Sequence, residues 1–228
     1  MKSARATGLR LAGRIASQIM AALLAVSCTS SPPPLVEPPS SDEFSVMSYN
    51  VRLYSFLDRD DDGQADDFKP DREINALVSL VAECRPDVLA IQEMGDRTAL
   101  EDFRRRLAAA GIDYPHHDHV GNREGSFANL SILSRFPIES PLPVTNLVYS
   151  IKGDTFPVQR GFQQVDLRVN ANTRFRLINV HLKSKLFHEA GQTEMRRNEA
   201  RLLATHVRRQ SRDASGIPML VCGDFNDS

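Results

Sequence analysis

The sequence predicts an α/β protein in which two mixed β-sheets pack face to face and helices cover the outside. Segments rich in β-branched and aromatic residues alternate with segments whose apolar residues recur every three or four positions. The expected order is strand, helix, strand, helix, then several strands in succession, then a helix and a strand. A doubly wound parallel sheet needs regular alternation, so packed mixed sheets fit this order better. The content of 41% apolar and 25% charged residues is that of a folded globular protein.

The elements are placed by periodicity and by turn signals. Strands are expected over Phe44–Asn50, Asp87–Glu93, Leu130–Ser134, Val144–Ser150, Gln159–Val169, Thr173–Leu182 and Pro218–Asp224. Helices are expected after Asp71, over Thr98–Ala110 and over Gln192–Arg212. Of the three cysteines, Cys84 and Cys222 are interpreted as small apolar core residues, because their wide separation favours neither a disulfide framework nor a zinc site.

The first 28 residues have the pattern of an export signal. Four basic residues precede an apolar run, Ile15–Val26, that is too short to span a bilayer comfortably. The run leads into Leu24-Ala-Val-Ser-Cys28, which resembles a bacterial lipoprotein signal with Cys28 as the lipidated residue. We therefore expect an exported protein, anchored to a membrane through Cys28 or, with plain signal cleavage, periplasmic or secreted.

Residues 29–42 are rich in Ser and Pro and predict an extended tether, followed by one folded domain over residues 43–228. Without residues 1–28 the chain has 24 basic and 29 acidic residues, a net charge of −5. Such a chain does not hold nucleic acid by its overall field. A polyanionic substrate would therefore need local Arg and Lys groups and a metal ion.

Four of the expected strands end in polar residues that a core strand does not need. The first end carries Asn50, and the second carries Glu93, which by alternation shares the face of Leu89 and Ile91. The third carries Asn179, His181 and Lys183 on one face, and the fourth carries Asp224 and Asn226 on one face. Carboxylate and amide oxygens suit a hard divalent cation, and His181, Lys183 and Arg160 add donors for a phosphoryl group. Together they predict a site for phosphoester hydrolysis.

The stretches SVMSYNVRLY, PDVLAIQEM, NLSILSRFPI, QRGFQQVDL, INVHLKSK, EMRRNEARLL and VCGDFND resemble the endonuclease/exonuclease/phosphatase superfamily, which includes deoxyribonuclease I, and occur in its order. The resemblance implies a four-layer sandwich, two sheets between helices, and Mg²⁺- or Mn²⁺-dependent hydrolysis. It implies that Glu93 is the main metal ligand, with Asn50 beside the metal and Asp224 next to both the metal and the attacking water. It also implies that Asn226, His181 and Arg160 contact the phosphate, with Lys183 as a further phosphate donor.

The same resemblance places another Asp and an Asp-His pair on strands that follow the GDFN segment, whereas the sequence ends at Ser228. We therefore expect the domain to lack its last strands and this His, and to hydrolyse phosphoesters more slowly than the family does.

Residues Asp58, Asp60 and Asp62 follow the first half of a calcium-binding loop, with Asp66 at the ninth position. Lys69 stands where the bidentate acid belongs, so an exposed acidic loop is favoured over a calcium site.

The leading interpretation is an exported nuclease or phosphodiesterase. A phosphomonoesterase or a sphingomyelinase-like lipid phosphodiesterase uses the same chemistry. A catalytically incomplete binding module is the alternative from another class.

If Cys28 carries a lipid, labelling with radioactive palmitate in a bacterial host will mark the wild-type protein. A Cys28→Ala variant will lose the label. Export without any label on the wild type would leave an ordinary signal peptide.

Overall fold

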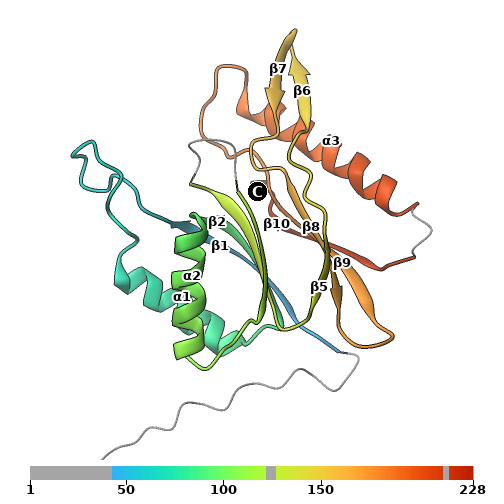
Figure 1. The fold of residues 1–228 in the computed structure, drawn as a ribbon. Coiled ribbons are helices and arrows are strands. Elements are labelled where there is room, and N and C mark those ends of the chain that lie inside the picture. The colour runs from blue at the N-terminus through green and yellow to red at the C-terminus, as the bar shows by residue number, and fades with distance from the viewer. Residues whose placement is uncertain (1–42, 122–126, 213–215, 228) are drawn as a thin grey trace, which may run out of the picture. The chain divides into compact units, whose positions relative to one another are not determined.

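The structure is a computed structural model that describes residues 43–121, 127–212 and 216–227 (Figure 1). The expected signal and tether over residues 1–42 lie outside the described residues. Among the described residues, no helix combines the length and the hydropathy needed to cross a membrane.

The chain forms three helices and ten strands within the described residues. The helices are α1 (Asp71–Cys84), α2 (Arg97–Ala109) and α3 (Gln192–Gln210). The strands are β1 (Val46–Tyr54), β2 (Val88–Met94), β3 (His116–Val120), β4 (Asn129–Ser134), β5 (Ile138–Pro141), β6 (Val148–Ile151), β7 (Asp154–Pro157), β8 (Phe162–Arg168), β9 (Arg174–His181) and β10 (Met219–Asp224).

Two four-stranded sheets are mixed, as the sequence predicts. The first has the order β1-β2-β4-β3, with β1 and β2 parallel and the other neighbours antiparallel. The second has the order β10-β9-β8-β5, with β9 and β10 parallel. Each sheet therefore contains one parallel pair, and the two strands of a parallel pair end at the same edge of their sheet.

Three apolar clusters define four layers. One cluster joins α1 and α2 to the outer face of the first sheet, through residues such as Phe103, Leu89 and Ile91. A second fills the space between the sheets, where Ala90 and Ile132 pack with Leu177. The third joins α3 to the outer face of the second sheet. The layers helix, sheet, sheet, helix confirm the predicted sandwich (Figure 1).

The strand predictions differ from the structure at several places. Within the segment Val144–Ser150, Val144 forms an isolated bridge to Phe162, and a strand begins only at Val148, where β6 pairs with β7 in a separate hairpin. Its two-residue turn has positive φ at Lys152 (53°) and Gly153 (96°), the geometry that matches strand twist in tight hairpins. Strands β3, β5 and β7 are four or five residues long and too short to show a clear alternation. Cys84 is exposed, so its placement in the core was wrong.

A buried polar layer joins the two sheets beside the apolar one. Asn179, which is fully buried, accepts a hydrogen bond from Gln92 Nε2 (2.7 Å) in the first sheet. Its own Nδ2 donates to the Ile91 carbonyl (3.0 Å) in the first sheet and to Gln163 Oε1 (3.1 Å) in the second. Because these buried groups bind one another across the space between the sheets, the network restrains how one sheet sits on the other.

Replacing Asn179 with Leu should lower the free energy of unfolding by about 2–3 kcal/mol, since Gln92 and the Ile91 carbonyl lose a buried partner at nearly constant volume. Urea unfolding of the full chain measures the loss. Asn172→Leu, at an exposed position of the β8–β9 turn, is the matched control and should change little. Equal stability of both variants would contradict the role given to Asn179.

Candidate active site

Polar residues from four strands, two from each sheet, meet at the side-chain amide of Asn50, although β1 does not end at Asn50 as predicted but continues to Tyr54. Asn50 Nδ2 donates to Glu93 Oε1 and to Asp224 Oδ2, both at 2.9 Å. His181 Nε2 lies 3.7 Å from each of the same two oxygens. The structure thus brings together two carboxylates, an imidazole and an amide that are far apart in the sequence.

Glu93 reaches this place through a β-bulge. Plain alternation would point it with Leu89 and Ile91 toward α1 and α2. Instead, the register of β2 shifts between Gln92 and Met94, and Glu93 has a φ of 61°. Bulges re-aim side chains in this way, and a non-glycine residue with positive φ is strained. The prediction that Glu93 lies on the same face of the sheet as Leu89 and Ile91 was therefore wrong, although Glu93 lies among the residues predicted for the site.

The amide of Asn50 has a fixed orientation. Its Oδ1 accepts a hydrogen bond from the Arg52 backbone N–H (2.8 Å), so its NH₂ group must face the carboxylates. In this arrangement Asn50 holds Glu93 and Asp224 in place and offers them donors. Its oxygen is not presented to the space between them, although the sequence predicts amide oxygens as cation ligands and the resemblance places Asn50 beside the metal.

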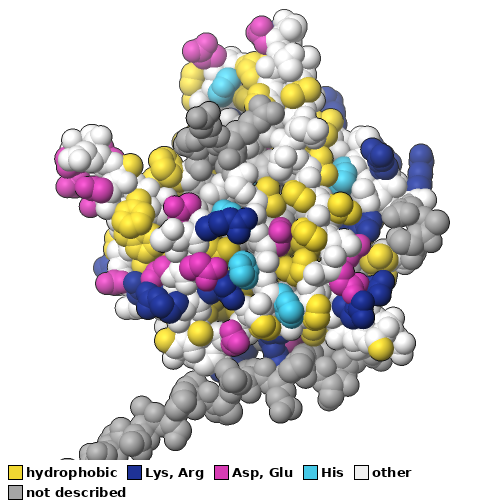
Figure 2. Space-filling model, in the orientation of Figure 1, with side chains coloured by type: hydrophobic (Ala, Val, Ile, Leu, Met, Phe, Trp, Pro, Cys, Tyr) yellow, Lys and Arg dark blue, Asp and Glu magenta, His cyan; other side chains and the backbone are white. Residues whose placement is uncertain are grey.

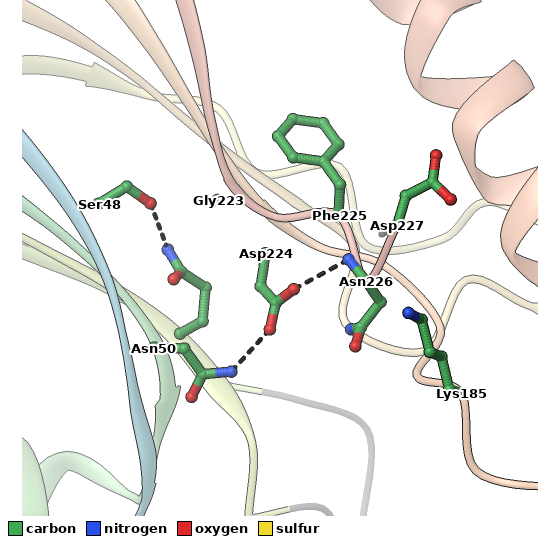
Figure 3. Close-up of a pocket in the computed structure, with 9 residues that line it drawn as sticks. Ser48, Asn50, Lys185, Gly223, Asp224, Phe225, Asn226 and Asp227 are labelled. Atoms are coloured by element: carbon green, nitrogen blue, oxygen red, sulfur yellow. Dashed lines mark hydrogen bonds between the residues drawn. The ribbon is translucent and has the colours of Figure 1, made fainter.

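Asp224 and Asn226 are positioned by the turn that ends β10. The Asn226 backbone N–H donates to Asp224 Oδ1 (2.9 Å), and Asn226 Nδ2 donates to the Leu182 carbonyl (2.9 Å). Figure 3 shows Asp224 between its two partners, Asn50 and Asn226. Gly223, with φ 141°, is required here because a Cβ would lie 2.0 Å from the Val180 carbonyl oxygen.

The electrostatics favour an ionised Asp224 and a neutral His181. Burial alone would raise the pKa of Asp224, but hydrogen bonds from Asn50 and Asn226 and the nearby His181 and Arg160 bring it below the ordinary value. Burial and the Arg160 charge lower the pKa of His181 to about 4, against an opposing effect of Asp224. At neutral pH the imidazole therefore carries no charge.

Of the two basic residues predicted at the site, the structure places one close to it. Arg160 is half-buried, donates to the Leu182 carbonyl (3.3 Å), and interacts electrostatically with Glu93 and Asp224. Burial lowers its pKa and these carboxylates oppose the shift. Lys183 Nζ instead contacts Ser184 Oγ and the Leu186 carbonyl, both at 3.4 Å, and does not line the pocket at this site.

A polar pocket of about 540 Å³ opens over Asn50, Asp224 and Asn226. Ser48, Gln92, Lys185, Gly223, Phe225 and Asp227 complete its wall (Figure 3). Glu93 and His181 are not part of the wall, and they adjoin it through Asn50 and Asp224. The face shown in Figure 2 mixes basic and acidic side chains and gathers neither sign into a broad field.

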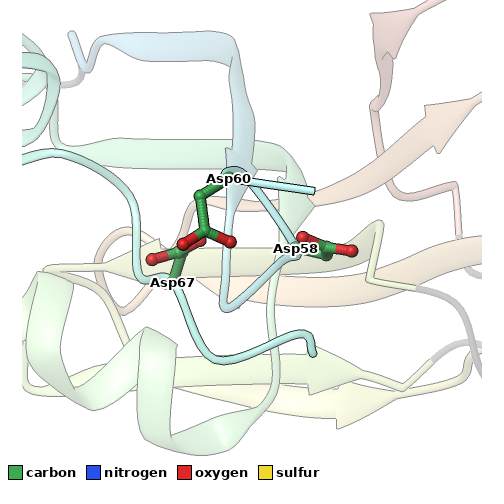
Figure 4. A group of neighbouring side chains, drawn as sticks. All are labelled: Asp58, Asp60 and Asp67. Atoms are coloured by element: carbon green, nitrogen blue, oxygen red, sulfur yellow. The ribbon is translucent and has the colours of Figure 1, made fainter. Parts of the chain in front are cut away.

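The acidic loop brings together a different set from the one predicted. Carboxylate oxygens of Asp58, Asp60 and Asp67 lie within 4.8 Å of one another (Figure 4). Asp62, which was predicted in the calcium set, is outside this group and accepts from the Gln64 N–H (2.8 Å). Asp67 joins the group because Leu57 and Asp67 pair through their backbones.

Glu199 was expected to form ion pairs along its helix in preference to a contact at the site, and its place beside the site was not predicted. It lies on α3, is 1% exposed, and accepts a hydrogen bond from the Lys183 backbone N–H (2.6 Å). The signal was present in the sequence, because Met195, Glu199 and Leu203 are spaced four apart and share the apolar side of the helix. A carboxylate in such a stripe predicts a buried partner.

Packed mixed sheets with carboxylates at their meeting strand ends define an α/β sandwich of the deoxyribonuclease I type. The profile of the Endonuclease/Exonuclease/phosphatase family matches residues 47–228, and the chain belongs to this family. No curated protein matches the chain significantly.

Several solved structures share the fold. Truncated Caenorhabditis elegans TDP2 has 19% sequence identity and a TM-score of 0.56 over 81% of this chain and 63% of that one. SmcL has 17% identity and a TM-score of 0.56 over 81% of this chain and 64% of that one. D. rerio TDP2 complexed with a single-strand DNA product has 14% identity and a TM-score of 0.57, over 82% and 62%. The chain thus spans less than two thirds of the length of these proteins.

The low pKa of His181 predicts a specific loss of stability in acid. The unfolded histidine binds a proton near its ordinary pKa of about 6.5 and the folded one only near pH 4, so stability falls as the pH drops between these values. For wild type, the step from pH 7 to pH 5 should cost about 1–2 kcal/mol more than for His181→Gln. Urea unfolding with a chelator present measures the difference. Identical pH dependence would contradict the assignment of a depressed pKa.

Proposed function

We propose that the protein is a divalent-metal-dependent phosphoester hydrolase, exported, with nuclease or phosphodiesterase activity. The observation that carries the proposal is the meeting of Glu93 and Asp224 at one amide, with His181 beside both oxygens. Membership of the Endonuclease/Exonuclease/phosphatase family supports the reaction class.

The residues fit a hard divalent cation such as Mg²⁺ or Mn²⁺. Glu93 and Asp224 direct carboxylate oxygens at the same place, where the neutral amide of Asn50 donates to both and His181 lies 3.7 Å from each. Converging carboxylates favour a cation, and an all-oxygen set suits Mg²⁺ or Mn²⁺ better than zinc. Such an ion supplies a Lewis acid for the phosphoryl oxygens. Glu93 and Asp224 would hold it, with Asn50 fixing both.

The remaining groups act on water and on the phosphate. Asp224 is kept ionised by its donors, so it can orient a water molecule and accept its proton. Asn226 and Arg160 both bind the Leu182 carbonyl, which sets them side by side as donors to phosphate oxygens. His181, neutral, donates without adding charge. Lys183 Nζ contacts its own loop, so we propose Lys185, which lines the pocket, as the further phosphate donor.

A nucleic-acid substrate is the first choice among phosphoesters. Its support is the similarity to D. rerio TDP2, whose structure holds a single-strand DNA product. A phosphomonoesterase or a sphingomyelinase-like lipid phosphodiesterase is the second candidate; ANGEL2, a 2',3'-cyclic phosphatase, shares the fold with a TM-score of 0.56.

We further propose that a lipid at Cys28 and the tether over residues 29–42 hold the domain at a membrane surface. Calcium at the acidic loop, with Asp58, Asp60 and Asp67 as ligands, remains a lesser proposal.

Replacing Glu93 with Gln should weaken Mn²⁺ binding about tenfold or more, because one of the two converging charges is lost while the shape is kept. Isothermal titration calorimetry on the full chain measures this. The control is the double variant Asp58→Asn/Asp60→Asn, which removes charge from the acidic loop and should bind Mn²⁺ at the strand ends as wild type does. Weakened Mn²⁺ binding by the double variant, together with unchanged binding by Glu93→Gln, would instead place the metal in the acidic loop.

The catalytic part of the proposal is tested with Mg²⁺ or a chelator on single-stranded DNA, RNA, bis(p-nitrophenyl) phosphate and p-nitrophenyl phosphate. We expect metal-dependent hydrolysis of at least one diester, and a loss of about 10²-fold or more in Asp224→Asn. Metal binding without any hydrolysis would instead support a catalytically incomplete binding module.

A further inference from the structure

One peptide unit, between Leu182 and Lys183, connects the phosphate side of the site to α3. Its carbonyl accepts hydrogen bonds from Asn226 Nδ2 (2.9 Å) and Arg160 Nη1 (3.3 Å). Its N–H donates to Glu199 Oε2 (2.6 Å). The unit follows directly after His181, the last residue of β9. Two candidate phosphate donors and one buried carboxylate therefore share a single peptide plane.

Glu199 is held rigidly where it meets this peptide. It is 1% exposed, and Met195 and Leu203, one helical turn away on each side, are buried against the second sheet. Arg196, also on α3, donates to the Lys183 carbonyl (3.3 Å). The helix thus binds the N–H and the carbonyl of Lys183, which leaves the end of β9 little freedom to rotate.

The charges on this peptide are arranged to reinforce one another. A positive guanidinium lies at the carbonyl end and a carboxylate at the N–H end, so both stabilise the peptide dipole. Burial raises the pKa of Glu199, and the Lys183 N–H and Arg160 oppose that shift. Glu199 Oε1 and Arg160 Nε are among the buried side-chain atoms without a hydrogen-bond partner in the described residues, and the opposite charges of the two groups help to compensate their burial.

We propose that Glu199 is a positioning residue of the phosphate-binding side of the site. It fixes the Leu182–Lys183 peptide, and the carbonyl of that peptide fixes Asn226 and Arg160. The inference rests on the proposed function only for the nature of the ligand, since the geometry stands by itself. The side-chain amide of Asn50 donates to both Glu93 and Asp224. The side chains of Asn226 and Arg160 are held instead through the peptide that α3 binds, although the Asn226 backbone N–H also donates to Asp224.

The test compares three variants of the full chain, Glu199→Ala, Glu199→Gln and Glu194→Ala. Gln keeps an acceptor for the Lys183 N–H, and Ala removes it. Glu194, on the same helix, pairs only with the exposed Arg197 and Arg201 among the ion pairs described, and serves as the control. Calorimetry measures Mn²⁺ alone, then thymidine 5'-monophosphate in the presence of Mn²⁺. Nuclear magnetic resonance follows the side-chain amides of Asn226 and Asn50.

We expect Glu199→Ala to weaken nucleotide binding about tenfold, as loss of a buried charge-assisted hydrogen bond implies, with Mn²⁺ affinity within about twofold of wild type. Glu199→Gln should restore most of the nucleotide affinity. The Asn226 amide resonances should shift in the Ala variant, while those of Asn50 stay.

Unchanged nucleotide affinity and an unmoved Asn226 amide in Glu199→Ala would overturn the inference. Equal losses of Mn²⁺ and nucleotide would also overturn it, since they indicate a general structural defect. If Glu199→Ala does not fold, the Glu199→Gln variant decides. Nucleotide binding by Glu199→Gln as weak as that of Arg160→Ala would overturn the inference. A wild type that binds no nucleotide would sink the proposed function, while the Asn226 resonances would still decide the positioning role.

Discussion

The hydrogen bond between Gln92 and Asn179 is the contact on which the site depends. The two sheets share no strand pairing, so only side chains set the position of one sheet on the other. Apolar packing between them has little directional preference and would tolerate a shift. The buried amides do not tolerate it, because a small slide would break several hydrogen bonds at once. The amides of Gln92 and Asn179 lie on the same strands as Glu93 and His181, next to the strand ends that carry these two residues.

This constraint explains how four residues from two sheets can meet at one amide. Each sheet supplies a parallel pair whose strands end together, β1 with β2 and β9 with β10. Asn50 then crosses from one sheet to the other to bind Asp224. The carboxylates stay close despite their like charge because Asn50 donates to both. Arg160 supplies a nearby positive charge.

The backbone carries strain at the same place. Glu93 and Asn226 both have positive φ, 61° and 53°, although neither is glycine. Such conformations persist only where the surroundings hold them. Here the holding groups are the bulge of β2 and the Gly223 turn, which allows β10 to approach Val180 closely. The site is therefore built on regular strands but aims its side chains through two irregular residues.

The sequence by itself determined the class of fold and predicted most of the residues that meet at the candidate site. The order of periodic segments predicted packed mixed sheets, and alternation grouped His181 with Asn179 and Asp224 with Asn226, because these features depend only on local geometry. The direction of Glu93 could not be predicted, since a bulge is set by the neighbouring strand β4 and leaves no local signal. The choice of Asp67 over Asp62 likewise follows from a backbone pairing across a loop. The tertiary structure alone decided that Glu199 meets the Lys183 peptide. That contact joins a helix to the end of a strand sixteen residues earlier, and the periodicity of neither element predicts how the two pack.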